Sequence, residues 1–162
     1  MKDKLHYFFS ISYLLSFTLL VFHYIQLDTT LSASLEALGK SAGISSRSMN
    51  VLLTFATVVF SLLLYLTYHY ILSIVLKKVC GNVTEQLSVA ILVSETVCNV
   101  FALTFIEVLP KILFYILIPI LGSTIMYFVL REKATKKFTV VAVLVRSVLY
   151  LSNVTALLLE LV

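Results

Sequence analysis

Charged residues are scarce in this sequence. They make up 12% of its 162 residues, about half of the share found in average soluble proteins. Hydrophobic residues make up 60%, and the mean hydropathy is +1.06. A soluble domain of this length must cover its surface with polar groups, and this chain has too few of them. The composition therefore excludes an ordinary soluble domain and predicts a chain surrounded by lipid.

Cysteine is scarce as well. Cys80 is expected in a cytoplasmic loop and Cys98 inside a membrane span, and two residues so placed build neither a disulfide framework nor a zinc site. The sequence also lacks a nucleotide-binding loop, a His/Glu metal motif on a helix and a nucleophile–base pair in a familiar context. We therefore expect no enzyme, no bound metal and no cofactor.

Long apolar runs predict an all-α, polytopic helical membrane bundle that forms a single domain over residues 1–162. Five transmembrane helices are expected, each near the length of about 20 residues that a crossing requires. Between the first two, leucines recur at helical spacing, which predicts a short amphipathic helix on the membrane surface over about residues 30–39. The expected spans are 5–26, 51–76, 87–108, 112–130 and 138–160.

Basic residues predict the orientation of these spans, because cytoplasmic segments carry an excess of Lys and Arg. With the N-terminus in the cytoplasm and the C-terminus outside, the cytoplasmic segments hold eight basic residues and the outer segments hold three, which are Lys40, Arg47 and Lys111. A re-entrant hairpin of the third and fourth spans, joined through Pro110, is an open alternative. The net charge of +4 thus indicates insertion rather than nucleic-acid binding. The cytoplasmic segments hold Lys2, Lys4, Lys77, Lys78, Arg131, Lys133, Lys136 and Lys137.

Two formal charges, Glu95 and Arg146, lie deep in apolar runs. Charged residues inside a membrane usually face the bundle interior and pair with one another. Each lies eight residues past the cytoplasmic start of its span, at Leu87 and Phe138, or about 12 Å deep at 1.5 Å per residue. We therefore predict a Glu95–Arg146 pair and expect the third and fifth spans to pack side by side.

One turn deeper, Asn99 and Tyr150 also match in depth, and Asn153 continues the stripe of Arg146 along the fifth span. On the third span, Ser88 shares the stripe of Glu95. Three interpretations stay open. The pair fixes the helix register, it forms a polar site for an ion, proton or polar ligand, or one charge reaches the membrane surface or a partner protein.

Proline and aromatic residues complete the prediction. Pro119, with Gly122 three residues later, predicts a kink in the fourth span, because proline lacks an N–H and its ring clashes with the preceding turn. His69, between two tyrosines near the end of the second span, is expected to anchor the helix at the interface. We interpret the nine tyrosines and eleven phenylalanines as mostly lipid-facing or packing residues.

Two segments carry a likeness to a known family. Residues 67–98 hold an apolar span that ends at Lys77-Lys78, a turn with Gly81, a polar helix start and a second span. Residues 118–143 place Gly122 before a basic turn and a final span. This pattern resembles bacterial members of the Yip-domain membrane family. The resemblance implies five spans, a cytoplasmic N-terminus, an external C-terminus, and work beside ABC transporters or in resistance to peptide toxins.

The function expected from these observations is that of a non-enzymatic, multi-pass accessory protein of the cell membrane, most simply a bacterial plasma membrane. It would act as an assembly or immunity partner of another membrane system such as a transporter. Its partners would be the lipid bilayer and another membrane protein or a second copy, and not nucleic acid. The alternatives are a self-assembling pore and a small transporter or channel whose polar site includes Glu95, Asn99, Arg146 and Asn153.

Overall fold

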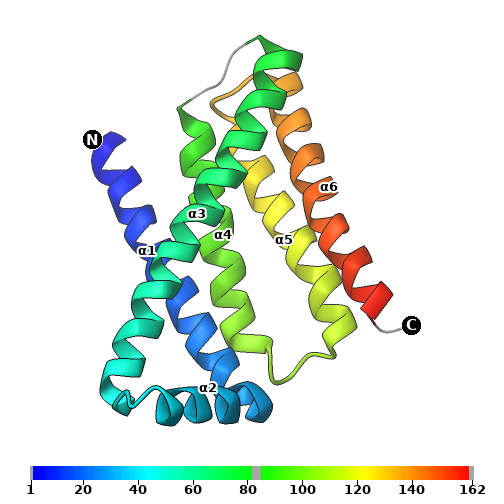
Figure 1. The fold of residues 1–162 in the computed structure, drawn as a ribbon. Coiled ribbons are helices and arrows are strands. Elements are labelled where there is room, and N and C mark those ends of the chain that lie inside the picture. The colour runs from blue at the N-terminus through cyan, green and yellow to red at the C-terminus, as the bar shows by residue number, and fades with distance from the viewer. Residues whose placement is uncertain (1, 82–84, 161–162) are drawn as a thin grey trace.

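Six α-helices and no strand make up the described part of the chain (Figure 1). The computed structural model describes residues 2–81 and 85–160, with the side chains of 4–45, 47–81, 85–110 and 113–150. The expected all-α class is therefore confirmed for these residues. The helices are α1 (Lys2–Leu27), α2 (Thr29–Ser41), α3 (Ser46–Cys80), α4 (Gln86–Phe105), α5 (Lys111–Arg131) and α6 (Lys136–Glu160).

Four of these helices are long and apolar enough to cross a bilayer. The candidate segments are Lys4–Leu27, Arg47–Cys80, Gln86–Phe105 and Leu113–Arg131. Since a crossing helix needs about 20 apolar residues, these segments indicate a multi-pass membrane protein. The fifth expected span corresponds to α6, and its passage through the membrane stays a prediction.

The ends of α3 show how local signals set the helix bounds. The Ser45 hydroxyl caps the start by accepting a hydrogen bond from the Ser48 N–H at 3.2 Å. Gly81 ends the helix in the left-handed region, with φ of 80°, where glycine has no steric penalty. Lys77 and Lys78 therefore belong to the last turn. The helix extends beyond the expected 51–76 because charges end an apolar run without ending a helix.

The short helix α2 lies across one end of the bundle (Figure 1). Asp28 caps it by accepting hydrogen bonds from two backbone N–H groups of the first turn. Leu31 and Leu38 remain exposed, as a helix resting on a lipid surface requires. On the polar face, Glu36 and Lys40 form an ion pair of 2.7 Å. The hydrogen bond from Lys40 lowers the pKa of the Glu36 carboxyl below its ordinary value.

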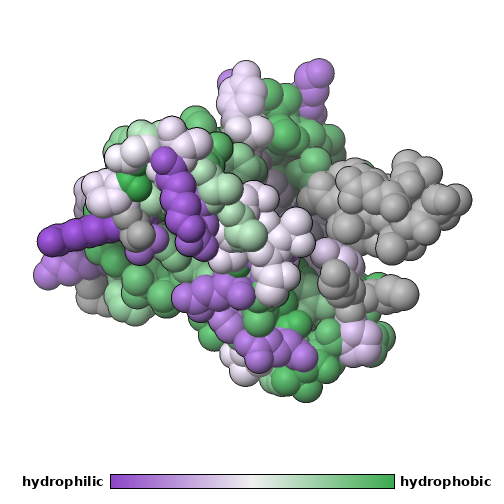
Figure 2. Space-filling view, turned by 60° about the horizontal axis from the view of Figure 1, so that its bottom comes forward, coloured by the Kyte–Doolittle hydropathy of each residue, from purple (hydrophilic) through white to green (hydrophobic). Residues whose placement is uncertain are grey.

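The apolar core lies at the opposite end of the bundle, near the α3–α4 and α5–α6 connections. There α3, α4, α5 and α6 converge, and toward the α2 end the helices spread apart (Figure 1). The outer surface is largely apolar, with hydrophilic side chains in separate groups (Figure 2). This one-sided convergence leaves an interior space at the α2 end. The core residues are Leu72, Leu76, Leu87, Ala90, Ile91, Met126, Leu130, Phe138 and Ala142.

Candidate functional site

Glu95 of α4 and Arg146 of α6 form the ion pair that their matched depths predict. Nη1 of Arg146 lies 2.6 Å from Oε1 of Glu95 and also donates to the Ser94 hydroxyl at 2.7 Å. The Tyr150 hydroxyl donates to the other carboxylate oxygen, Oε2, at 2.6 Å. The Arg146 side chain is fully buried, and the Glu95 side chain is 16% exposed. The carboxylate thus has charged or hydroxyl donors on both oxygens.

The expected side-by-side packing of these two helices is wrong. α5 packs against both α4 and α6, and no Cα atom of α4 lies within 8 Å of one of α6 among the described residues. Matched depth shows how far each charge lies along its helix, but it does not show which helix lies between them. Because an arginine side chain is long, Arg146 reaches α4 across the gap.

Gly122 of α5 makes this reach possible. A Cβ atom at this position would overlap with Nη2 and Cζ of Arg146 and would lie 2.8 Å from the Cys98 sulfur. The absence of a side chain therefore leaves room for the guanidinium. Pro119 also lies inside α5, and the kink expected there stays a prediction. The role of Gly122 is thus to admit a side chain from the neighbouring helix.

The other groups around the guanidinium are a sulfur atom and two aromatic rings. Its Nη2 lies 3.7 Å from the Cys98 sulfur, and its Cζ lies 4.8 Å from the ring centroid of Tyr150 and 5.9 Å from that of Tyr68. The Nε atom has no hydrogen-bond partner among the described residues. A buried cation of this kind is tolerable only beside its counter-ion, so Glu95 is indispensable to the placement of Arg146.

Asn99 lies one turn beyond Glu95 on α4. Its amide nitrogen donates to the Ser16 hydroxyl of α1 at 3.2 Å, and its place over the ion pair with Tyr150 stays a prediction. Ser88, on the same stripe of α4, bonds the His6 imidazole of α1 at 2.7 Å and the Tyr65 hydroxyl of α3. The polar stripe of α4 therefore contacts three different helices. Asn153 belongs to α6, but its side chain lies outside the described residues.

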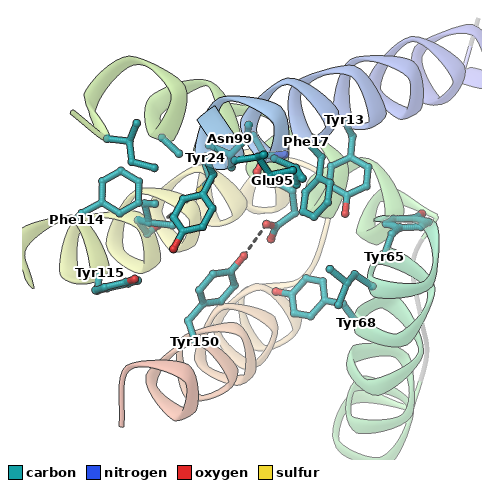
Figure 3. A pocket seen from close by; sticks show the side chains of 18 of the residues that line it. Tyr13, Phe17, Tyr24, Tyr65, Tyr68, Glu95, Asn99, Phe114, Tyr115 and Tyr150 are labelled. Carbon is teal, nitrogen blue, oxygen red and sulfur yellow. Dashed lines mark hydrogen bonds between the residues drawn. The ribbon is translucent and has the colours of Figure 1, made fainter. Parts of the chain in front are cut away.

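A cavity of about 1330 Å³ opens beside the ion pair. Side chains of every helix contribute to its lining, and Glu95 and Tyr150 reach it together (Figure 3). Eight aromatic residues of α1, α3, α5 and α6 belong to this lining. The sequence predicts aromatic residues that face lipid or pack; Tyr7 and Tyr70 are exposed, but these eight line the cavity, and Tyr24 and Tyr115 among them are also partly exposed. The eight are Tyr13, Phe17, Tyr24, Tyr65, Tyr68, Phe114, Tyr115 and Tyr150.

The sequence did not indicate the cavity because no periodicity records where packed helices separate. One signal was present: the polar stripe of Ser88, Glu95 and Asn99 marked the face of α4 that points inward. All three residues make their hydrogen bonds inside the bundle. Extending the same stripe analysis to the tyrosines of α3 would have placed Tyr65 and Tyr68 on one inward face.

No protein-family model matches this chain, and no curated protein or solved structure matches it either. The resemblance to the Yip-domain family and the roles that it implies therefore stay predictions. Since a helical membrane fold supports many unrelated activities, only the chemistry of the cavity and the ion pair bears on function.

Proposed function

We propose that this protein is a small transporter that takes an amphipathic molecule into its intramembrane cavity. The observation that supports this proposal is that a cavity of about 1330 Å³ reaches the buried Glu95–Arg146 pair. Ligand pockets usually enclose about 300–1,000 Å³, so the space suffices for a small organic molecule. Ionisable residues inside a membrane typically mark substrate or ion pathways.

The proposal includes five spans in a cell membrane, with the N-terminus in the cytoplasm and the C-terminus outside. The α3–α4 and α5–α6 connections lie at the same end of the bundle as the N-terminus (Figure 1). Lys77, Lys78, Arg131, Lys133 and Lys136 flank these connections, and basic residues favour the cytoplasmic side. α2 and the α4–α5 connection would then lie outside, and the cavity would open toward that side.

The accessory role, which is the first expectation from the sequence, becomes the second proposal. It rests on the Yip-domain resemblance and on the small share of chain outside the apolar helices. The cavity favours the transporter, because a protein that acts only through lipid-facing contacts has no need for an interior space that reaches a carboxylate.

The test uses purified protein and a panel of cationic, anionic and neutral aromatic molecules. Leu64→Trp places a large ring at the cavity, and Leu66→Trp is its matched control, since Leu66 is exposed on α3 and does not line the cavity. At least one class of molecule is expected to raise the melting temperature of the wild type and of Leu66→Trp, and to enter proteoliposomes of both. Leu64→Trp should show neither effect. The proposal fails if no member of the panel binds or is taken up.

A further inference from the structure

The charged groups that line the cavity are all acidic. Asp28, Glu95 and Glu107 contribute to the lining, and no lysine, arginine or histidine does so within the described part of the chain. Oε1 of Glu107 lies 3.1 Å from Nε2 of His23 on the α2 side of the bundle. This carboxylate therefore has an ionic partner only when the imidazole is protonated. A cavity with this lining repels an anionic ligand and attracts a cationic one.

Arg146 lies behind the carboxylate and not in the cavity. Its side chain has no exposed surface and does not contribute to the lining, whereas Glu95 does. The pair is neutral as a whole, but its negative end is turned toward the cavity. Since charges interact more strongly in a low-dielectric interior than in water, this orientation favours a cation in the cavity.

The aromatic rings supply a second kind of attraction. Figure 3 shows the rings of Tyr13, Tyr65, Tyr68 and Tyr150 on different sides of Glu95. Cations are attracted to the faces of aromatic rings, because the ring carries partial negative charge there. The same rings offer apolar surface to the body of an organic molecule, which a hydrated metal ion could not use.

One hydroxyl group of the cavity lacks a partner. The Tyr68 hydroxyl oxygen is buried and makes no hydrogen bond of good geometry with the described residues, although the Arg146 guanidinium lies near its ring. Figure 3 shows it directed toward the place where Tyr150 meets Glu95. A buried hydroxyl without a partner costs free energy, and a ligand that carries a polar or charged group would satisfy it there.

From these contacts we infer that the cavity binds an organic cation with an aromatic or apolar body. The charge would lie between Glu95 and the hydroxyl of Tyr68, and the body would lie against the rings of α1 and α5. This inference rests on the proposed function, and it adds the chemical class of the ligand.

Tetraphenylphosphonium and tetraphenylborate are the probes that test it, because they share shape and size and differ in the sign of charge. Binding is measured on purified protein, as the difference between Leu66→Trp and Leu64→Trp to remove partition into detergent. The cation is expected to bind at least roughly tenfold more tightly than the anion. Equal binding, or preference for the anion, would overturn the inference.

Variants at two positions test the roles of the charge and of the aromatic ring separately. Glu95→Gln leaves Arg146 without a counter-ion, so the preference should shift toward tetraphenylborate. Because this variant can also disturb folding, Tyr115 offers an independent test at a half-exposed position that lines the cavity. Tyr115→Leu removes a ring against which the body of the ligand packs and should weaken binding of the cation about threefold or more, and Tyr115→Phe should leave it unchanged. Equal affinity of the leucine and phenylalanine variants would contradict the role of the ring.

The panel of the transporter test distinguishes the two claims. If anionic or neutral molecules bind and the cation does not, the ligand class is wrong and the transporter proposal stands. If no molecule binds, both proposals fall.

Discussion

The guanidinium of Arg146 lies in the space that Gly122 leaves open on α5. Through this space a side chain of α6 reaches Glu95 of α4, although the backbones of α4 and α6 do not meet. The long side chain of Arg146 and the carboxylate of Glu95 thus connect α6 to α4, and the lack of a side chain at Gly122 of α5 leaves the space for this contact. Of these residues only Glu95 lines the cavity, and Arg146 holds it in place from behind, so packing and candidate function depend on each other here.

Gly122→Ala is expected to destabilise the protein by about 1–3 kcal/mol, since overpacking of an interior displaces side chains from their favoured positions. The added methyl group would meet Nη2 and Cζ of Arg146. Unfolding in detergent, followed by heat or denaturant, measures the effect. The double variant Gly122→Ala with Arg146→Ala is the control: the methyl group should cost less in that background. An equal cost in both backgrounds would show that Arg146 does not occupy this space.

Glu95→Gln and Arg146→Gln are each expected to cost about 3–5 kcal/mol, because each leaves a buried charge without its partner. The double variant should cost less than the sum of the single ones. The exposed His23–Glu107 pair provides a matched comparison, and Glu107→Gln should cost no more than about 1 kcal/mol. Additive effects at Glu95 and Arg146 would contradict a direct interaction.

Tyr150→Phe removes the hydroxyl that donates to Oε2 of Glu95. Hydrogen bonds to charged groups contribute about 1.5–3 kcal/mol, so a loss of this size in the free energy of unfolding is expected. Tyr70→Phe is the control, because Tyr70 is 67% exposed on α3 and its hydroxyl lies outside the cluster. The melting temperature of Tyr150→Phe should be clearly lower than that of Tyr70→Phe. Equal melting temperatures would show that the Tyr150 hydroxyl does not stabilise the Glu95 carboxylate.

Much of the architecture could be predicted because it depends on local composition. Apolar length predicts the helices, Gly81 predicts a turn after the second span, and equal depth predicts that Glu95 meets Arg146. Each of these inferences uses only the position of a residue along its own helix, which the sequence contains directly.

The errors concern the arrangement of helices around one another. The sequence predicts that the third and fifth spans pack side by side, whereas α5 packs against both α4 and α6. The place of Gly122 opposite Arg146 and the hydrogen bond from Asn99 to Ser16 of α1 follow from the same arrangement. Rotation about a helix axis and the choice of neighbour depend on the whole bundle, and so does the cavity that forms where the helices spread.

The proposed topology can be tested with single cysteines in a chain that carries Cys80→Ala and Cys98→Ala. Lys40→Cys on α2 should react with a membrane-impermeant maleimide on intact cells. Lys133→Cys, between α5 and α6, should react only after the membrane is made permeable, because basic connections stay in the cytoplasm. A C-terminal epitope tag should be accessible on the side of Lys40→Cys if α6 crosses the membrane. The opposite labelling pattern would overturn the orientation.

Transport through the cavity requires that the space beside Glu95 be open to water and polar solutes. The most direct measurement compares Leu64→Cys and Leu66→Cys in the cysteine-free chain, in membranes, with a water-soluble cationic thiosulfonate. Both leucines are exposed on α3, but only Leu64 lines the cavity. Leu64→Cys is predicted to react at least tenfold faster than Leu66→Cys, which faces lipid, a difference of about 1.4 kcal/mol in barrier height. Equal, slow modification of the two cysteines would contradict the claim.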